Sequence, residues 1–105
     1  VPIHTIVTGC AMSCGFLISI GGHKRMAYKN STFMYHQINS EKVGKLKDIE
    51  EDVIEGKRLQ EVVNKYIVRH TKITADKLKQ VYDTKQDWYL NAEEALTYGI
   101  IDEII

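Results

Sequence analysis

A strand-like run that passes through a glycine into an apolar helical segment constrains the fold of this chain most strongly. Residues 4–8 are rich in β-branched side chains, and Gly9 ends the run. Residues 12–20 have helical spacing, and a helix that is apolar all round has to be buried. Such a strand–turn–helix step indicates a layered α/β fold.

Ser13 lies at the bend between the expected strand and the expected helix. Near the amino end of a helix, unpaired backbone N–H groups and the helix dipole favour developing negative charge. A serine nucleophile in acyl transfer generates an oxyanion beside its own oxygen, so this place suits such a nucleophile. The simpler interpretation is a small residue that fits a tight turn, and the turn by itself favours that interpretation.

The rest of the chain alternates between the two kinds of element. Further strands are expected at 25–28, 32–36, 87–90 and 100–105, and further helices at 44–70, 74–82 and 91–99. Thr74 is a suitable N-cap, and Asn91 with Glu94 matches a capping box. This alternation predicts an α/β layered fold, and 105 residues suit one domain.

Residues 44–70 form the longest amphipathic segment of the chain. The apolar face of its second half has helical spacing and consists of Leu59, Val62, Val63, Tyr66 and Ile67. Three apolar residues continue the pattern toward the start of the segment: Ile49, Val53 and Ile54. We expect this apolar surface to be larger than one small domain covers. The alternative is a solvent-facing helix that packs on one side only.

Charge and cysteine content exclude several classes of protein. Lys and Arg together number 14, as do Asp and Glu, and no basic stripe suggests nucleic acid or a membrane surface. No apolar run approaches the roughly 20 residues that span a bilayer. Cys10 and Cys14 could form a metal pair, a disulfide or a redox switch. Because free cysteine behaves as a small hydrophobe, we expect both to pack around the turn instead.

Three segments together resemble a known family. They are 9–15 (Gly-Cys-Ala-Met-Ser-Cys-Gly), 32–37 (Thr-Phe-Met-Tyr-His-Gln) and 87–90 (Asp-Trp-Tyr-Leu). In this order they are similar to the serine turn, the histidine strand and the aspartate-bearing strand of ClpP, the proteolytic subunit of the Clp protease. Further landmarks of that family match at 30–31, 48–50, 70–71, 91–95 and 98–102. The resemblance implies a ClpP/crotonase-like layered fold in which residues 44–70 are the long handle helix.

Carried over residue by residue, the resemblance implies a catalytic triad. Ser13 corresponds to the nucleophile, His36 to the general base and Asp87 to the residue that orients the base. The backbone N–H of Cys14 corresponds to one oxyanion donor. The resemblance implies no metal and no organic cofactor.

Other residues compete for the roles of base and acid. Three further histidines are alternatives for the base: His4, His23 and His70. We expect each of them to be structural or solvated. Asp83 is the alternative for the acid, but it suits the end of its own helix, whereas Asp87 directly precedes the aromatic strand.

The function that the resemblance implies is that of a cytoplasmic serine endopeptidase. In the family, homo-oligomeric subunits form stacked heptameric rings, and an AAA+ ATPase feeds unfolded polypeptides into their inner chamber. No nucleic-acid or membrane partner is implied. The alternatives are a phage-type maturation protease that works without an ATPase, a non-catalytic ring subunit, and an acyl-CoA-handling enzyme of the related crotonase-like fold.

The sequence departs from the family pattern in two places, before the serine turn and after the histidine strand. Family members have roughly as much chain again before the serine turn, including a Gly-rich loop that supplies the other oxyanion donor. We therefore expect residues 1–105 to be the C-terminal portion of a ClpP-like catalytic domain. After His36 and Gln37, the residues Ile-Asn-Ser-Glu at 38–41 replace a proline and a Gly-rich strand that pairs with substrate. We expect the peptide specificity to be altered accordingly.

Overall fold

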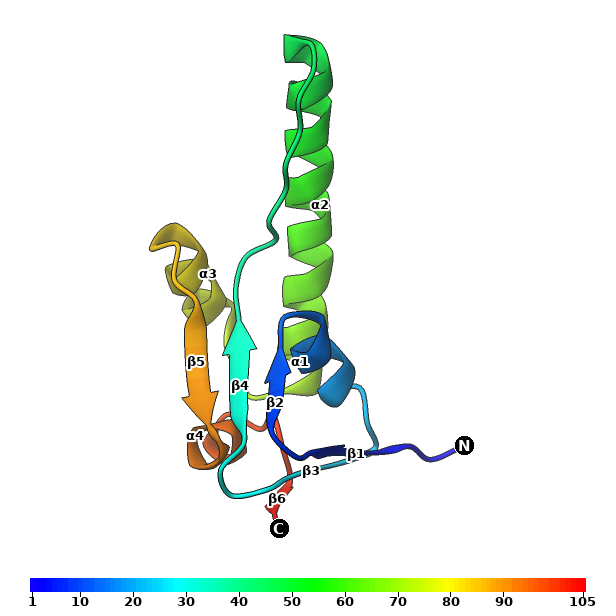
Figure 1. Ribbon diagram of the computed structural model, residues 1–105, viewed down its shortest axis with the longest axis vertical. Coiled ribbons are helices and arrows are strands. Elements are labelled where there is room, and N and C mark those ends of the chain that lie inside the picture. Colours follow the sequence, from blue (N-terminus) through cyan, green and yellow to red (C-terminus); the bar gives the residue numbers. More distant parts are fainter.

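The computed structural model describes residues 1–105 as two small sheets and four helices (Figure 1). The first sheet is parallel and has the order β1-β3-β6, with bounds His4–Val7, Lys24–Ala27 and Glu103–Ile104. The second sheet has the order β2-β4-β5, with bounds Cys10–Met12, Thr32–Tyr35 and Trp88–Asn91. In it β4 is parallel to β2 and antiparallel to β5. The mixed α/β class expected from the alternating pattern is confirmed.

The helices agree with most of the expected segments. They are α1 (Cys14–Ser19), α2 (Leu46–His70), α3 (Ala75–Asp83) and α4 (Ala92–Thr97). The hydroxyl of Thr74 accepts a hydrogen bond from the backbone N–H of Lys77, which confirms Thr74 as the N-cap of α3. Gly99 follows α4 with a φ of 71°, a conformation that glycine adopts without a steric cost.

A single apolar core joins the second sheet to the helices around it. Fifteen buried apolar side chains form this core, and the largest that are fully buried are Phe16, Phe33, Ile20, Ile67, Ile73, Leu78, Leu90, Ile100 and Ile101. They come from α1 and the residue after it, β4, the C-terminal end of α2, the connection from α2 to α3, α3, β5 and the segment before β6. The core therefore holds the second sheet and the last turns of α2 as one packed unit.

The expected helix at 12–20 is wrong at its start. Cys10–Met12 is strand β2, because its backbone pairs with β4, and the helix begins only at Cys14. The helix is also not buried all round, since Ile18 is 72% exposed and Leu17 is half-buried. A run of apolar residues does not by itself distinguish a short buried strand from a helix; the pairing with β4 decided it here.

The expectation that Cys10 and Cys14 pack around the turn is also wrong. Both are exposed, and neither forms a disulfide. Successive side chains of a strand point to opposite faces, and in β2 Ala11 is the one that faces the core. Cys10 is therefore directed away from the core. No three His, Cys, Asp or Glu side chains come together as a metal site.

The last strand is shorter than expected. Only Glu103–Ile104 pairs, with Met26 and Ala27 of β3, whereas a strand was expected over 100–105. Ile100 and Ile101 are buried in the core as part of the connection from α4. Burial of apolar side chains in a connection gives the same sequence pattern as burial in a strand.

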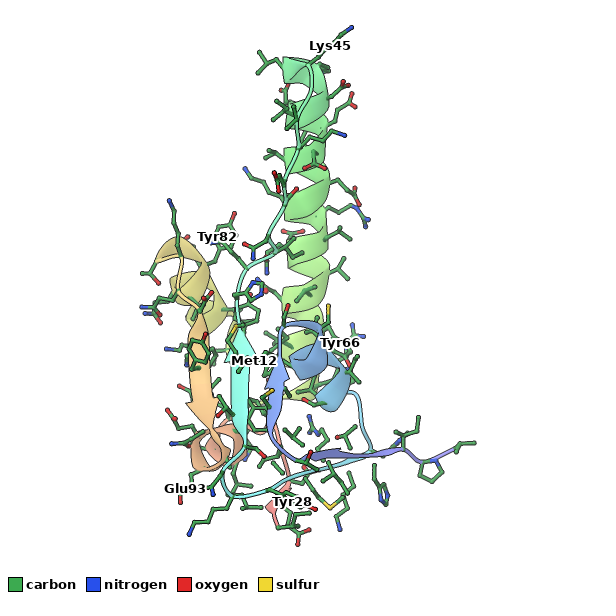
Figure 2. All side chains as sticks on the ribbon, in the orientation of Figure 1. Met12, Tyr28, Lys45, Tyr66, Tyr82 and Glu93 are labelled. Atoms are coloured by element: carbon green, nitrogen blue, oxygen red, sulfur yellow. The ribbon has the colours of Figure 1, made fainter.

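Helix α2 extends far beyond the sheets, as Figures 1 and 2 show. Near its C-terminus Ile67 is fully buried, and the Tyr66 hydroxyl donates to the carbonyl oxygen of Leu17 at 3.1 Å. Toward its N-terminus Leu46 is 83% exposed, and Val53 and Ile54 are exposed as well. The prediction that the apolar residues of this helix extend beyond the part covered by the core is confirmed. None of the helices combines the length and the apolar character needed to cross a membrane.

Replacing Asn91 with alanine is expected to lower the free energy of unfolding by about 1 kcal/mol. The Asn91 side chain accepts from Glu94 N at 2.8 Å, and Glu94 Oε1 accepts from Asn91 N at 3.0 Å, so the predicted capping box is present. Urea unfolding measures the difference. Asn30→Ala, in an exposed turn, is the matched control and should leave the unfolding midpoint within a few tenths of a molar of the parent's. Equal losses for both variants would contradict a capping role.

Candidate active site

The second sheet brings three candidate residues to one of its ends. In the register, Met12 of β2 pairs with Met34 of β4. Tyr35 of β4 pairs with Trp88 of β5. Just beyond the ends of these three strands lie the three residues singled out in the sequence: Ser13, His36 and Asp87. Because β5 runs antiparallel to the other two strands, its first residue lies at the same end as their last.

Ser13 occupies a sharp turn between β2 and α1. Its φ is 56° and its ψ is −117°, a backbone conformation that costs a non-glycine residue about 1–3 kcal/mol. The turn is held on both sides: Ser13 N donates to Met34 O at 3.0 Å, and Ser13 O accepts from Leu17 N at 3.2 Å. The hydroxyl makes no hydrogen bond to the start of α1, and the residue is exposed. Backbone hydrogen bonds thus hold the turn, while the Ser13 hydroxyl does not cap the helix.

Ser13 and His36 line the same pocket, which has a volume of about 530 Å³. The other residues that line it are mostly apolar: Cys14, Leu17, Tyr35, Ile38, Asn39, Leu59 and Val63. They come from α1, from the end of β4 and the segment after it, and from α2. An apolar chamber with a serine and a histidine in its wall can hold an apolar side chain next to the hydroxyl.

The half-buried His36 imidazole has a defined partner on one nitrogen. Its Nδ1 lies 2.5 Å from the carbonyl oxygen of Gln37. A carbonyl oxygen only accepts hydrogen bonds, so in the neutral imidazole Nδ1 carries the proton and Nε2 is the acceptor. An imidazole in this tautomer can take a proton from a hydroxyl through Nε2.

The structure does not bring Asp87 into contact with His36. Asp87 is exposed, forms no hydrogen bond or ion pair with the imidazole, and is not among the residues that line the pocket. Its alternative, Asp83, is the last residue of α3 and accepts from Lys79 Nζ at 2.6 Å. Of the two aspartates, Asp87 is the one that directly precedes β5.

The three other histidines lie away from the pocket. His4 is exposed in β1. The Nδ1 atom of His23 accepts from Ile3 N at 2.9 Å. The His70 ring packs against Tyr66 with 4.5 Å between the ring centroids. These environments agree with the expectation that the three are structural or solvated.

A buried polar network beside the pocket was not foreseen from the sequence. Gln60 of α2 donates to the Tyr35 hydroxyl at 3.0 Å and accepts from Ile38 N at 2.7 Å. The Tyr35 hydroxyl donates to Asn64 Oδ1 at 2.7 Å. Burial raises the pKa of the Tyr35 hydroxyl, and the hydrogen bond from Gln60 acts in the opposite sense. The available signal was two amide side chains four residues apart, which share one face of a helix.

Comparisons with known proteins agree over the whole chain. The family model for Clp protease matches residues 1–105. The ATP-dependent Clp protease proteolytic subunit of Deinococcus radiodurans is 36% identical over 106 residues, which cover 99% of this chain and 51% of that protein. The subunit of the same name from Dehalococcoides mccartyi is 36% identical over 105 residues, which cover 98% of this chain and 52% of that protein.

The chain therefore spans about half the length of the curated relatives that it matches. The resemblance read from the serine turn, the histidine strand and the aspartate-bearing strand is confirmed at the level of the family. Since the family model matches every residue from 1 to 105, this chain belongs to the Clp protease family.

Proposed function

We propose that residues 1–105 are the C-terminal, triad-bearing portion of a serine endopeptidase subunit. One observation carries the proposal: a serine with a free hydroxyl and a histidine with an available Nε2 line the same apolar pocket. This pairing of a nucleophile with a base is what serine-type peptide hydrolysis requires. The names of the relatives, each a proteolytic subunit, support the same reaction class.

In the proposed mechanism Ser13 Oγ attacks the carbonyl carbon of a peptide bond. His36 Nε2 takes the hydroxyl proton and passes it to the leaving amine when the C–N bond breaks. A water molecule then attacks the ester carbonyl while His36 takes a proton from it, and His36 returns this proton to Ser13 Oγ as the acyl C–Oγ bond breaks, which releases the carboxyl product and free Ser13. Cys14 is the first residue of α1, so its N–H has no partner within the helix and is suited to donate to the oxyanion.

Asp87 is proposed to stabilise the imidazolium form of His36. Tyr35 and Trp88 are the last pair of the β4–β5 ladder, so the next residue on each strand lies across from the other. Asp87 precedes Trp88 and His36 follows Tyr35, so the Asp87 carboxylate starts near the imidazole and can face it when His36 becomes positively charged. The Gln37 carbonyl already holds Nδ1 in the required tautomer.

The substrates and partners are proposed from the family. Unfolded polypeptides are the substrate class, and the apolar walls of the pocket suit apolar side chains. The relatives are named ATP-dependent, which supports a partner ATPase, and they are named subunits, which supports an assembly of several chains. The AAA+ class of that ATPase, the stacked heptameric rings and the cytoplasmic location are proposed from the family resemblance alone. The uncovered apolar residues of α2 provide surface for contacts between subunits.

Labelling with a serine-directed fluorophosphonate tests the proposal. We expect one adduct, located by peptide mass spectrometry on Ser13, because this serine shares a pocket with the imidazole of His36. Ser13→Ala should lose the adduct, and Ser40→Ala, a serine whose hydroxyl donates to Asp52 instead, should keep it. An adduct that persists in the Ser13→Ala chain would overturn the assignment of the nucleophile.

Two observations favour a second candidate, a non-catalytic ring subunit. Asp87 lies outside the pocket, and His36 has a backbone carbonyl rather than a carboxylate as its partner. A chain of this kind would assemble with itself or with active subunits but would leave Ser13 unreactive. The same labelling experiment decides, because a folded chain without any Ser13 adduct would support the second candidate over the first.

A further inference from the structure

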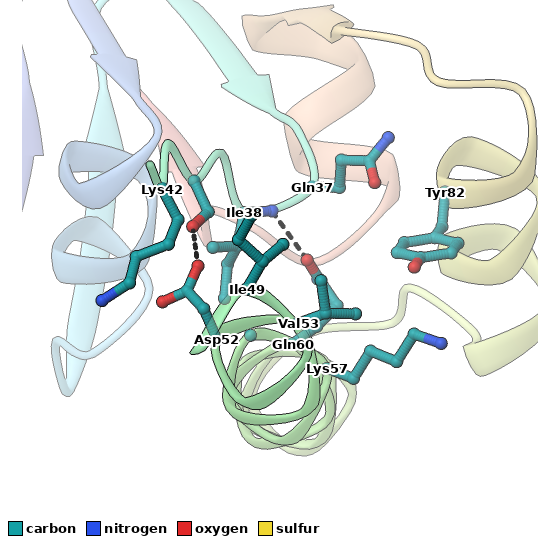
Figure 3. A pocket seen from close by; sticks show the side chains of 11 residues that line it. Gln37, Ile38, Lys42, Ile49, Asp52, Val53, Lys57, Gln60 and Tyr82 are labelled. Atoms are coloured by element: carbon teal, nitrogen blue, oxygen red, sulfur yellow. Dashed lines mark hydrogen bonds between the residues drawn. The ribbon is translucent and has the colours of Figure 1, made fainter. Parts of the chain in front are cut away.

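Gln60 is one of only three buried polar side chains in the protein. It is 7% exposed, whereas glutamine usually lies at the surface. Three hydrogen bonds hold its amide: Oε1 accepts from Ile38 N at 2.7 Å, and Nε2 donates to the Tyr35 hydroxyl and to Asn64 Oδ1, each at 3.0 Å. Figure 3 shows the bond to Ile38 across the space between α2 and the segment after β4.

The partners of Gln60 lie on the two sides of His36. Tyr35 directly precedes His36, and Ile38 lies two residues after it. Hydrogen bonds from Gln60 of α2 therefore hold the chain on both sides of the imidazole. The β4 strand ends at Tyr35, and no further strand forms before α2. From His36 onward the backbone therefore has no ladder to hold it, and side chains of α2 take that role.

We propose that Gln60 is a positioning residue that fixes the His36 imidazole relative to Ser13 by holding the backbone on both sides of it against α2. This inference rests on the proposed function, since it assigns a task within that site. Gln60 is not itself among the residues that line the pocket with Ser13. It acts through Tyr35 and Ile38, which do line that pocket.

The expected effect follows from geometry. Proton transfer needs a separation of about 2.6–3.2 Å between the hydroxyl and the base. Displacing a reacting group by about 1 Å can slow a reaction about 100-fold. A methionine at position 60 has nearly the same length and volume as glutamine but offers no hydrogen bond to Ile38 N. The backbone around His36 would then be free to shift, while the apolar packing of α2 is kept.

The experiment measures fluorophosphonate labelling of Ser13 in the full chain as a function of probe concentration, which separates the maximal rate kinact from the half-saturating concentration KI. Three variants are compared with the parent: Gln60→Met, Gln60→Asn and Gln80→Met. The asparagine keeps an amide but is one methylene shorter, so its oxygen falls about 1.5 Å short of Ile38 N. Gln80, exposed on α3, is the matched control.

We expect Gln60→Met to lower kinact about 10- to 100-fold, with KI changed less than about threefold. Gln60→Asn should lower kinact as well. Gln80→Met should match the parent. A kinact for folded Gln60→Met within about twofold of the parent would overturn the inference, as would a change in KI alone. Circular dichroism shows which variants fold; if Gln60→Met does not, Gln60→Asn decides by the same criteria.

The failure of this inference is distinguishable from the failure of the proposed function. If the parent chain is labelled at Ser13 and both Gln60 variants are labelled equally fast, the serine peptidase assignment stands and the positioning role is wrong. If the folded parent chain is not labelled at all, the proposed function fails, and the positioning role assigned within it fails as well.

Discussion

Replacing His36 with alanine is expected to slow the reaction of Ser13 by about four to six powers of ten. A serine hydroxyl is a weak nucleophile at neutral pH and depends on a base to take its proton. His36 is the only histidine that lines the pocket with Ser13, and its Nε2 is the nitrogen left to accept. The measurement is the rate of fluorophosphonate labelling at Ser13.

The matched control for this prediction is His4→Ala. His4 is exposed on β1 in the other sheet and does not line the pocket, so the labelling rate should stay within about twofold of the parent's. A His36→Ala chain that is folded and labelled at the parental rate would show that Ser13 does not depend on this imidazole. The triad assignment would then be wrong even if Ser13 proved reactive.

The same assay resolves the role of Asp87. Loss of an orienting aspartate that contacts its histidine directly costs about 10⁴-fold. We expect a smaller loss for Asp87→Asn, because the Gln37 carbonyl continues to hold Nδ1 of His36. Asp83→Asn, whose carboxylate pairs with Lys79 instead, should have no effect. A full 10⁴-fold loss for Asp87→Asn would mean that Asp87 closes onto the imidazole during the reaction.

Replacing Phe33 with alanine is expected to lower the free energy of unfolding by about 3–5 kcal/mol. Phe33 is 0% exposed in the middle of β4, where it is paired with Ala11 on one side and Leu90 on the other. Removing its ring leaves a cavity in the core that joins the sheet to the helices. Since small domains have about 5–15 kcal/mol of stability in total, the loss is a large share of it.

Urea unfolding followed by circular dichroism checks this second prediction. Tyr89→Ala is the control: Tyr89 lies on the neighbouring strand of the same sheet but is exposed, so its loss should cost less than about 1 kcal/mol. A Phe33→Ala chain that unfolds at the parental midpoint would contradict the placement of β4 at the centre of the core. Because β4 also leads to His36, the folded fraction of Phe33→Ala should be labelled more slowly than the parent.

Local patterns in the sequence predicted the elements whose cause is local. The capping box of Asn91 and Glu94 and the N-cap Thr74 are chemistry between residues three apart, and both are present. The long helix follows from helical spacing sustained over many turns, and α2 covers Leu46–His70. Ser13, His36 and Asp87 could be assigned to one candidate site from the sequence only because their three segments resemble those of a known family.

The errors occurred where distant pairing decides the structure. Residues 10–12 form a strand because β4 lies beside them, and the apolar spacing of the neighbouring segment favoured a helix. Cys10 faces away from the core because Ala11 faces into it, a choice of face that composition cannot predict. The contacts of Gln60 were not foreseen either, since its hydrogen-bond partners Tyr35 and Ile38 lie 25 and 22 residues away in the sequence.

The sequence by itself determined the α/β class, most of the helix and strand positions, the family, and the identity of the serine and histidine as a candidate pair. The tertiary structure decided that both residues line one pocket, that Nδ1 of His36 meets a backbone carbonyl, and that Asp87 lies outside that pocket. The physical reason is the range of the interactions. Capping and periodicity act within a few residues, whereas the placement of Ser13 and His36 in one pocket depends on the register of β2 with β4 and on the hydrogen bond between Gln60 of α2 and Ile38.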